Sequence, residues 1–336
     1  GLVGSETCIR DRKMRDTILF GDCRETLKEF DEQARMCVTS PPYYGLRDYG
    51  GEENQIGQEQ TPDDFIDQLV NVFKEVRNVL TDDGTCWVNL GDSYYNYRPG
   101  KGQGLPRQTV ANTKQDLPDV CPRRGNRIEG LKEKDLIGIP WLFAFAMRND
   151  GWYLRQDIIW HKPNPMPESV RDRCTKSHEY IFLFSKNKKY FYDNEAIKEP
   201  AKDWGTRDRT NGKYHNEGTG LQPHSGLTKS YPTKNKRSVW SVTVKPYKEA
   251  HFATYPPDLI EPCILAGSEE GDTVLDPFMG AGTTAAVAKS LNRHYIGCEL
   301  NEDYGNLIQK RIQDYKPVQP VKEVAQEPCI NIFDII

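Results

Sequence analysis

Four consecutive residues, Ser40-Pro41-Pro42-Tyr43, carry groups that could bind and activate an amino group on a flat ring. They follow an apolar segment, residues 36–38, that is typical of the end of a buried strand. The two prolines fix φ and remove two main-chain donors, so the chain leaves the strand in a stiff, extended turn whose carbonyls can accept hydrogen bonds. The Ser40 hydroxyl is a further acceptor, and the Tyr43 ring offers a face for stacking. A Pro-Pro pair also serves simply to end a strand, and these four residues, here called the proline corner, leave both interpretations open.

A second candidate for chemistry is the glycine turn, residues 276–282, which reads Asp-Pro-Phe-Met-Gly-Ala-Gly between a strand-like and a helix-like segment. Gly280 and Gly282 let the main chain approach a ligand closely. Glu299 ends the next strand, near the offset of about 20 residues expected for an acid that binds ribose hydroxyls. These features favour a nucleoside cofactor and suit NAD as well as S-adenosylmethionine. Asp276 favours S-adenosylmethionine, because a carboxylate suits an ammonium group and is unfavourable beside a pyrophosphate.

Short apolar runs alternate with periodic segments along the chain, and this alternation predicts an α/β fold with a parallel sheet. The predicted strands are residues 17–20, 36–38, 85–90, 152–160, 178–185, 274–276 and 294–298. The predicted helices are residues 24–30, 61–80, 137–149, 256–266, 283–291 and 302–315. Both motifs would then directly follow predicted strands.

The composition indicates a globular protein, with 37% hydrophobic and 28% charged residues among 336. No apolar run approaches the about 20 residues of a membrane span, and residues 1–15 do not resemble a signal peptide. The nine cysteines show no C-x-x-C pair, which predicts no zinc site and a reducing compartment. Four of them lie in apolar segments and are expected to be buried free thiols: Cys37, Cys86, Cys263 and Cys298.

The proline corner and the glycine turn together resemble the amino-methyltransferases of DNA, whose motifs are Asp/Asn/Ser-Pro-Pro-Tyr and Phe-x-Gly-x-Gly. The corner precedes the turn, as in the β group of that family, which is a circular permutation of the common fold. Further matches occur at residues 21–22, 91–93 and 251–256, so the resemblance covers about residues 16–315. It implies a circularly permuted Rossmann-like methyltransferase sheet with helices on both faces and irregular inserts for DNA recognition.

The resemblance also implies a division of the chain. Residues 16–192 would form the catalytic half of the methyltransferase domain, with a loop insert at 94–130. Residues 239–316 would form the cofactor-binding half of the same domain. Residues 193–238 would be a target-recognition insert, and residues 317–336 a C-terminal tail.

Roles for single residues follow from the same resemblance. The proline corner would be catalytic. The residues expected to bind S-adenosylmethionine are Asp276, Phe278, Gly280 and Gly282 at its methionine end, Glu299 at its ribose, Asp22 and Cys23 at its adenine, and His251, Ala253 and Thr254 closing over it. Considered alone, Asp22 would form a turn with its own main chain and His251 would enter a helix.

The implied reaction is methyl transfer to an exocyclic amino group of a base flipped out of the duplex, with S-adenosylhomocysteine as the second product. Ser40 Oγ and the Pro41 carbonyl would accept the two amino hydrogens and concentrate the nitrogen lone pair opposite the sulfonium methyl, while Tyr43 stacks on the base. In the family a first serine usually accompanies N4-cytosine and a first aspartate N6-adenine. We therefore expect cytosine-N4 methylation, with adenine-N6 as the alternative.

Two other functions are more distant alternatives. A NAD-dependent oxidoreductase would leave the proline corner unexplained, and a non-catalytic DNA-binding module would leave both motifs unused. Cytosine C5 chemistry would need a Pro-Cys turn; the two Pro-Cys pairs lie in a predicted helix and in the tail.

Double-stranded DNA is the expected partner despite a net charge of −4, because the footprint of a nucleic acid is local. The candidate phosphate contacts are Arg123, Arg124, Arg127, Arg171, Arg173, Lys234, Lys236 and Arg237, each of which would also be ordinary as a solvated surface charge. A cognate restriction endonuclease is a possible second partner, and the chain would be a monomer or homodimer without a membrane or metal partner. It would act in the cytoplasm, at the nucleoid, in a prokaryote or phage, and in the nucleus of a eukaryote.

Overall fold

An eight-stranded mixed sheet forms the centre of the computed structural model, which describes residues 14–45, 55–95, 128–201, 232–244 and 255–316. Its strand order is β1-β10-β9-β2-β3-β5-β4-β8. The strands are β1 Thr17–Phe20, β2 Ala34–Thr39, β3 Leu80–Leu90, β4 Tyr153–His161, β5 His178–Ser185, β8 Val239–Ser241, β9 Thr273–Asp276 and β10 His294–Glu299. The prediction of an α/β fold is confirmed.

The prediction that the sheet is parallel is wrong at β5, which runs antiparallel to both of its neighbours, β3 and β4. Parallel neighbours need a crossover connection, usually a helix, whereas residues 162–177 join β4 to β5 without one. The chain therefore returns beside β4 in the opposite direction. All other neighbouring pairs in the sheet are parallel.

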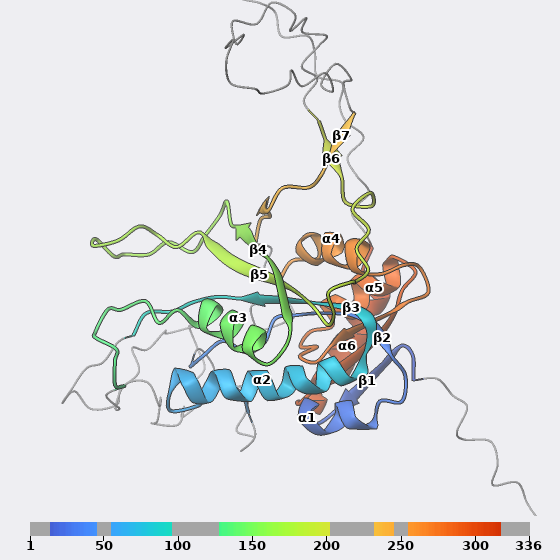
Figure 1. Ribbon diagram of the computed structural model, residues 1–336, viewed down its shortest axis with the longest axis horizontal. Helices are drawn as coiled ribbons and strands as arrows, with labels where there is room; N and C mark the ends of the chain where they lie inside the picture. The colour runs from blue at the N-terminus through green and yellow to red at the C-terminus, as the bar shows by residue number, and fades with distance from the viewer. Residues whose placement is uncertain (1–13, 46–54, 96–127, 202–231, 245–254, 317–336) are drawn as a thin grey trace, which may run out of the picture.

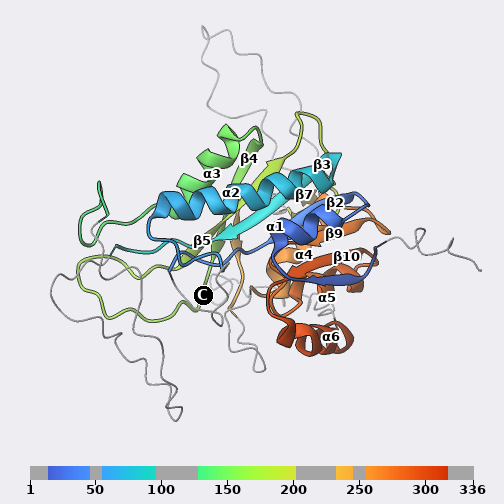
Figure 2. The same cartoon turned by 90° about the horizontal axis from the view of Figure 1, so that it is seen from below.

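Helices cover both faces of the sheet, as predicted (Figures 1 and 2). One layer contains α1 Cys23–Thr26, which a short 3-10 helix Leu27–Glu29 extends, together with α2 Pro62–Val79 and α3 Ile139–Asn149. The other contains α4 Pro257–Gly267, α5 Thr283–Ser290 and α6 Gly305–Asp314, preceded by the 3-10 helix Glu302–Tyr304.

Successive side chains of the central strands alternate between the two layers, as a pleated strand requires. Cys37 and Cys86 face the first layer, while Met36, Val38 and Trp87 face the second. Apolar burial on both faces explains why these strands read as continuous apolar runs. The four thiols expected to be buried and free are so.

The two motif-bearing strands, β2 and β9, are direct neighbours although they come from opposite ends of the chain. Met36 pairs with Val274 and Cys37 with Leu275. Beyond β9 the sheet continues with β10 and then with β1, the first strand of the chain. The series β9-α5-β10-α6-β1 is thus continuous in space and interrupted only in chain order, which is the circular permutation that the resemblance implied.

A smaller ladder pairs β6 Glu199–Pro200 with β7 Thr233–Lys234 and extends away from the main sheet (Figure 1). It pairs described residues that lie on either side of positions 202–231. In the described parts of the chain, no helix combines the length and the apolar character needed to cross a membrane.

Candidate active site

The proline corner and the glycine turn meet at the carboxyl ends of β2 and β9. Thr39, the last residue of β2, donates a hydrogen bond from Oγ1 to Oδ1 of Asp276, the last residue of β9, over 2.6 Å. Both side chains are buried, at 1% and 0% exposure. Ser40, the next residue, is only half-buried. The serine of one motif is therefore held beside the first residue of the other.

Asp276 is the centre of this junction. Its Oδ1 also accepts from the Phe278 amide at 3.0 Å, and its Oδ2 accepts from the hydroxyls of Tyr255 at 3.0 Å and Thr284 at 2.5 Å. Burial raises the pKa of Asp276, and the hydrogen bonds from its partners act in the opposite direction. The carboxylate thus ties the end of β2, the glycine turn and the first turn of α5 together. Its direct contact with a cofactor ammonium stays a prediction.

The two glycines of the turn are needed for different reasons. Both have positive φ, +52° at Gly280 and +80° at Gly282, a region that favours glycine. A Cβ on Gly282 would lie 2.9 Å from Cγ2 of Ile308, so this glycine lets α5 pack against α6. Among the described residues, a Cβ on Gly280 would meet only the Phe278 carbonyl oxygen, at 3.9 Å. No described residue therefore fills the space that a side chain at Gly280 would occupy, and a ligand could approach the main chain there.

Glu299 lies against the same turn from the end of β10. Its Oε2 accepts from the Gly280 amide at 2.7 Å, and its Oε1 accepts from the Asn301 amide at 3.0 Å. Burial raises the pKa of Glu299 to about 7. Near neutral pH this carboxyl group can accept or donate hydrogen bonds, which suits ribose hydroxyls.

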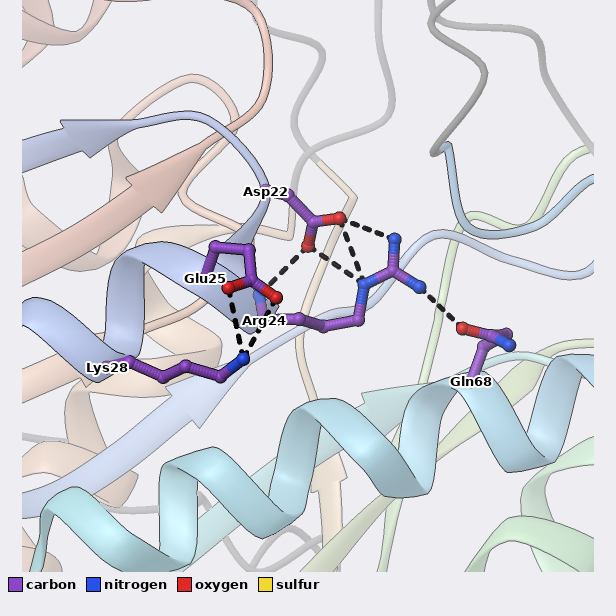
Figure 3. Close-up of polar contacts among 5 residues, drawn as sticks. All are labelled: Asp22, Arg24, Glu25, Lys28 and Gln68. Carbon is purple, nitrogen blue, oxygen red and sulfur yellow. Dashed lines mark hydrogen bonds and ion pairs between the residues drawn. The ribbon is translucent and has the colours of Figure 1, made fainter.

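Asp22 begins α1 next to the end of β10, since the amide of the preceding Gly21 donates to the Glu299 carbonyl at 2.9 Å. Its carboxylate accepts from the Arg24 amide at 2.9 Å and from the Arg24 guanidinium, which also donates to Gln68 Oε1 at 2.5 Å (Figure 3). Burial acts to raise the pKa of Asp22, but the bonds and charge of Arg24 outweigh it, so the pKa lies below its usual value. The turn that the residue alone predicted is present.

Other side chains of α1 and of the short helix after it lie beside Asp22. Lys28 forms an ion pair with Glu25, 2.9 Å apart, on the outer side of the helix (Figure 3). Cys23 is buried, and burial raises the pKa of its thiol. A buried, protonated thiol packs as an apolar group. Its contact with an adenine stays a prediction.

Tyr43 is fixed on the other side of the proline corner. Its hydroxyl donates to Glu179 Oε2 at 2.7 Å, and its ring lies directly against Gly91. Pro41 is buried, whereas Pro42 and Tyr43 are half-buried. Stacking of Tyr43 on a base stays a prediction.

Several predicted site residues lie outside the described part of the chain: His251, Ala253 and Thr254 among the cofactor residues, and Arg123, Arg124 and Arg127 among the cations. Of the described cations, Arg171 is exposed. Arg173 forms an ion pair with Glu168, and Lys234 and Arg237 both pair with Glu199, at 3.3 and 2.6 Å. Lys236 lies over the Trp240 ring, 5.2 Å from its centroid. Three of the candidate cations thus already have protein carboxylates as partners.

The sequence predicted no role for Thr39, Thr284, Tyr255, Arg24 or Glu179, each of which contacts a predicted site residue here. The first two flank the motifs by position, which is the only signal that the sequence carries for them. In the described ranges no group of three or more His, Cys, Asp or Glu side chains is arranged to hold a metal ion.

Comparisons with known proteins give a consistent result. The N6/N4 DNA methylase family profile matches residues 34–310. Type II methyltransferase M.SmaI of Serratia marcescens is 46% identical over 309 residues, which cover 92% of this chain and 94% of that protein. Type II methyltransferase M.XycI of Xanthomonas campestris pv. cyanopsidis is 47% identical over 302 residues, which cover 89% of this chain and 89% of that protein.

Solved structures show the same fold at lower identity. The PvuII DNA methyltransferase, described as cytosine-N4-specific, has a TM-score of 0.58 at 19% identity, over 90% of this chain and 88% of that one. A Thermus thermophilus protein described as a putative DNA modification methylase, solved in complex with S-adenosylmethionine, has a TM-score of 0.52 at 22% identity, over 88% and 92%.

Proposed function

Because the chain belongs to the N6/N4 DNA methylase family, we propose that it transfers a methyl group from S-adenosylmethionine to N4 of a cytosine in double-stranded DNA. S-Adenosylhomocysteine and one proton, lost from the methylated nitrogen, are the other products. The observation that carries the proposal is the buried hydrogen bond from Thr39 to Asp276, which holds the proline corner beside the glycine turn. Serine as the first residue of the corner supports cytosine over adenine.

The glycine turn and the end of β10 fit this cofactor. The described residues leave room for a ligand beside the main chain of Gly280, and Glu299, with a pKa of about 7, offers hydrogen bonds to a ribose. Phe278 is half-buried beside them and offers an apolar surface. S-Adenosylmethionine supplies an electrophilic methyl group on a sulfonium. The chain has to orient that group toward the proline corner and exclude water.

The proline corner activates the nucleophile. The amino nitrogen of cytosine is a poor nucleophile because its lone pair is delocalised into the ring. Ser40 Oγ and the Pro41 carbonyl accept its two hydrogens, and this pair of bonds favours the pyramidal nitrogen. Since the corner is rigid and tied to Asp276, the acceptors are in place before the base arrives, so little reorganisation is required during the reaction.

Labelled cofactor and duplex DNA of mixed sequence provide the test. The DNA is digested to nucleosides after reaction, and mass spectrometry identifies the methylated base. We expect N4-methylcytosine. N6-Methyladenine, the alternative that uses the same residues, or 5-methylcytosine would contradict the proposal.

Substitution of the serine tests its role. We expect Ser40→Ala to keep its affinity for S-adenosylmethionine and to lose most methyl transfer, because one of the two acceptors is gone. Ser290→Ala is the matched control, since that hydroxyl donates to the Val287 carbonyl at the end of α5. Undiminished turnover by Ser40→Ala would refute the assignment.

The biological setting is proposed from the relatives. The two named above are Type II methyltransferases of bacteria. We propose that this chain likewise protects DNA from a restriction endonuclease of the same specificity, at the nucleoid in the cytoplasm. DNA methylated by the chain should then resist that endonuclease, and full cleavage would contradict this setting.

A further inference from the structure

A carboxylate outside both motifs contacts the tyrosine of the proline corner. The hydroxyl of Tyr43 donates to Oε2 of Glu179 at 2.7 Å, across 136 residues of sequence. Glu179 lies at the start of β5, and its side chain is only 14% exposed. A carboxylate that is largely shielded from water needs partners, and Glu179 has them on three different segments of the chain.

The other two partners of Glu179 come from both sides of β5. The ammonium of Lys162, just after β4, forms an ion pair with Oε1. Asn89, near the end of β3, donates from Nδ2 to Oε2 at 3.3 Å and to the Tyr180 carbonyl at 3.1 Å. Asn89 on β3 and Lys162 after β4 therefore hold Glu179 in place independently of Tyr43. The carboxylate is thus a fixed acceptor for the hydroxyl of Tyr43.

The ring of Tyr43 is held by a second contact, with the main chain of Gly91. A Cβ at Gly91 would lie 2.7 Å from Cε2 and 3.2 Å from Cδ2 of the ring. Gly91 does not have a positive φ. The contact therefore needs glycine for space and makes no demand on the backbone conformation.

We propose that Glu179 is a positioning residue that holds Tyr43 ready to stack on the flipped base. With its hydroxyl bound to Glu179 and its ring against Gly91, Tyr43 loses little freedom when a base arrives, so that stacking is preorganised. The inference rests on the proposed function and deepens it. Lys162 balances the charge of Glu179, so the carboxylate does not repel the DNA.

The sheet order predicts which step depends on Glu179. The glycine turn follows β9, on one side of β2, whereas Glu179 lies on β5, two strands away on the other side. Loss of Glu179 should therefore weaken the capture of the base and leave the binding of S-adenosylmethionine unchanged. A residue that merely supported the fold would lower both.

A double-mutant cycle with Tyr43→Phe and Glu179→Ala tests the proposal. Methyl transfer to duplex DNA of mixed sequence gives kcat and KM for DNA, and calorimetry gives the affinity for S-adenosylmethionine. We expect each single variant to lose about tenfold in kcat/KM, as for one hydrogen bond to a charged acceptor. The double variant should lose no more than either single one, because both remove the same interaction.

Further variants separate positioning from folding. Glu179→Gln keeps an acceptor for the tyrosine and should regain activity to within about threefold of wild type. Gly91→Ala displaces the ring but leaves Glu179 with Lys162 and Asn89, and should lose activity to a similar extent even if Glu179→Ala fails to fold. Tyr153→Phe, on an exposed part of β4, and Glu75→Ala, at a half-buried position of α2, are the matched controls.

The outcomes distinguish the two proposals. Losses that multiply in the double variant, unchanged kcat/KM for Glu179→Ala, or undiminished activity of Gly91→Ala overturn the role of Glu179. N6-Methyladenine as the wild-type product overturns the proposed base, while the coupling can still be measured on that product. Absence of methyl transfer by the wild-type chain overturns both.

Discussion

Substitution of Thr39 by valine isolates the bond that joins the two motifs. Valine keeps the β-branched shape that suits a strand and removes only the hydroxyl. The bond spans 2.6 Å and is fully buried, and Asp276 would retain three other donors. The loss is then that of one hydrogen bond to a charged group, about 1.5–3 kcal/mol in the free energy of unfolding.

The same substitution should change how stability depends on pH. Burial raises the pKa of Asp276 in the folded protein, and the Thr39 hydroxyl counteracts part of that rise. When folding raises the pKa of a carboxyl group, the free energy of unfolding falls as the pH rises from the unfolded to the folded pKa. It is lowest above the folded pKa, where the buried group is ionised. Thr39→Val raises that pKa further, so its loss of stability should be greater at mildly alkaline than at acidic pH.

Urea unfolding, followed at both pH values, measures this effect. Thr17→Val is the matched control, because that strand hydroxyl donates to the Arg15 carbonyl at 3.1 Å and should contribute about 1 kcal/mol or less. Methyl transfer should fall with Thr39→Val by up to about 100-fold, because the corner is no longer fixed relative to the turn. If Thr39→Val matches Thr17→Val in stability and keeps full activity, the hydrogen bond does not hold the site together.

Three further predictions concern the cofactor side. The pKa of Glu299 is about 7, and a cationic ligand binds better when this group is ionised, so the affinity for S-adenosylmethionine should rise as the pH increases through 7. Calorimetry should find this rise for the wild type and no such rise for Glu299→Gln. Gly282→Ala would place a side chain at a φ of +80°, with its Cβ 2.9 Å from Ile308, and should lower the free energy of unfolding by about 1–3 kcal/mol. Urea unfolding measures this loss, and an unchanged free energy of unfolding would contradict the packing argument. Arg24→Ala removes the guanidinium that holds the Asp22 carboxylate and should weaken cofactor binding several-fold. The partly exposed pair of Arg24 and Asp22 contributes only about 1 kcal/mol or less to stability. Equal cofactor affinity of the variant and the wild type would exclude a role of Arg24 in binding.

The sequence predicted most of the fold because its strands are short apolar runs separated by glycine, proline and periodic helices. The direction of β5 was not predictable, since the run from Tyr180 to Phe184 is apolar throughout and reads the same for a parallel or an antiparallel strand. Its direction depends on the connection, residues 162–177, which contains three prolines and forms no helix.

The candidate site was predictable where local chemistry is unusual, as in the paired prolines and the glycines with positive φ. It was not predictable where ordinary residues acquire a role through tertiary register. Thr39 is one threonine among many, and only the pairing of β2 with β9 brings it to Asp276, 237 residues away. Glu179 likewise stands in an apolar strand, and nothing in the local pattern indicates that it faces Tyr43.

The pairing of β2 with β9 has a consequence for synthesis of the protein on the ribosome. While the nascent chain is shorter than about 270 residues, β2 can pair only with β3, because β9 has not yet been synthesised. The hydrogen bond from Thr39 to Asp276 cannot form at that stage either. An unpaired apolar strand edge is a site for aggregation and for chaperone binding. The last fifth of the chain therefore determines when the nascent protein stops being vulnerable, and a stalled or truncated translation product would retain that exposed edge.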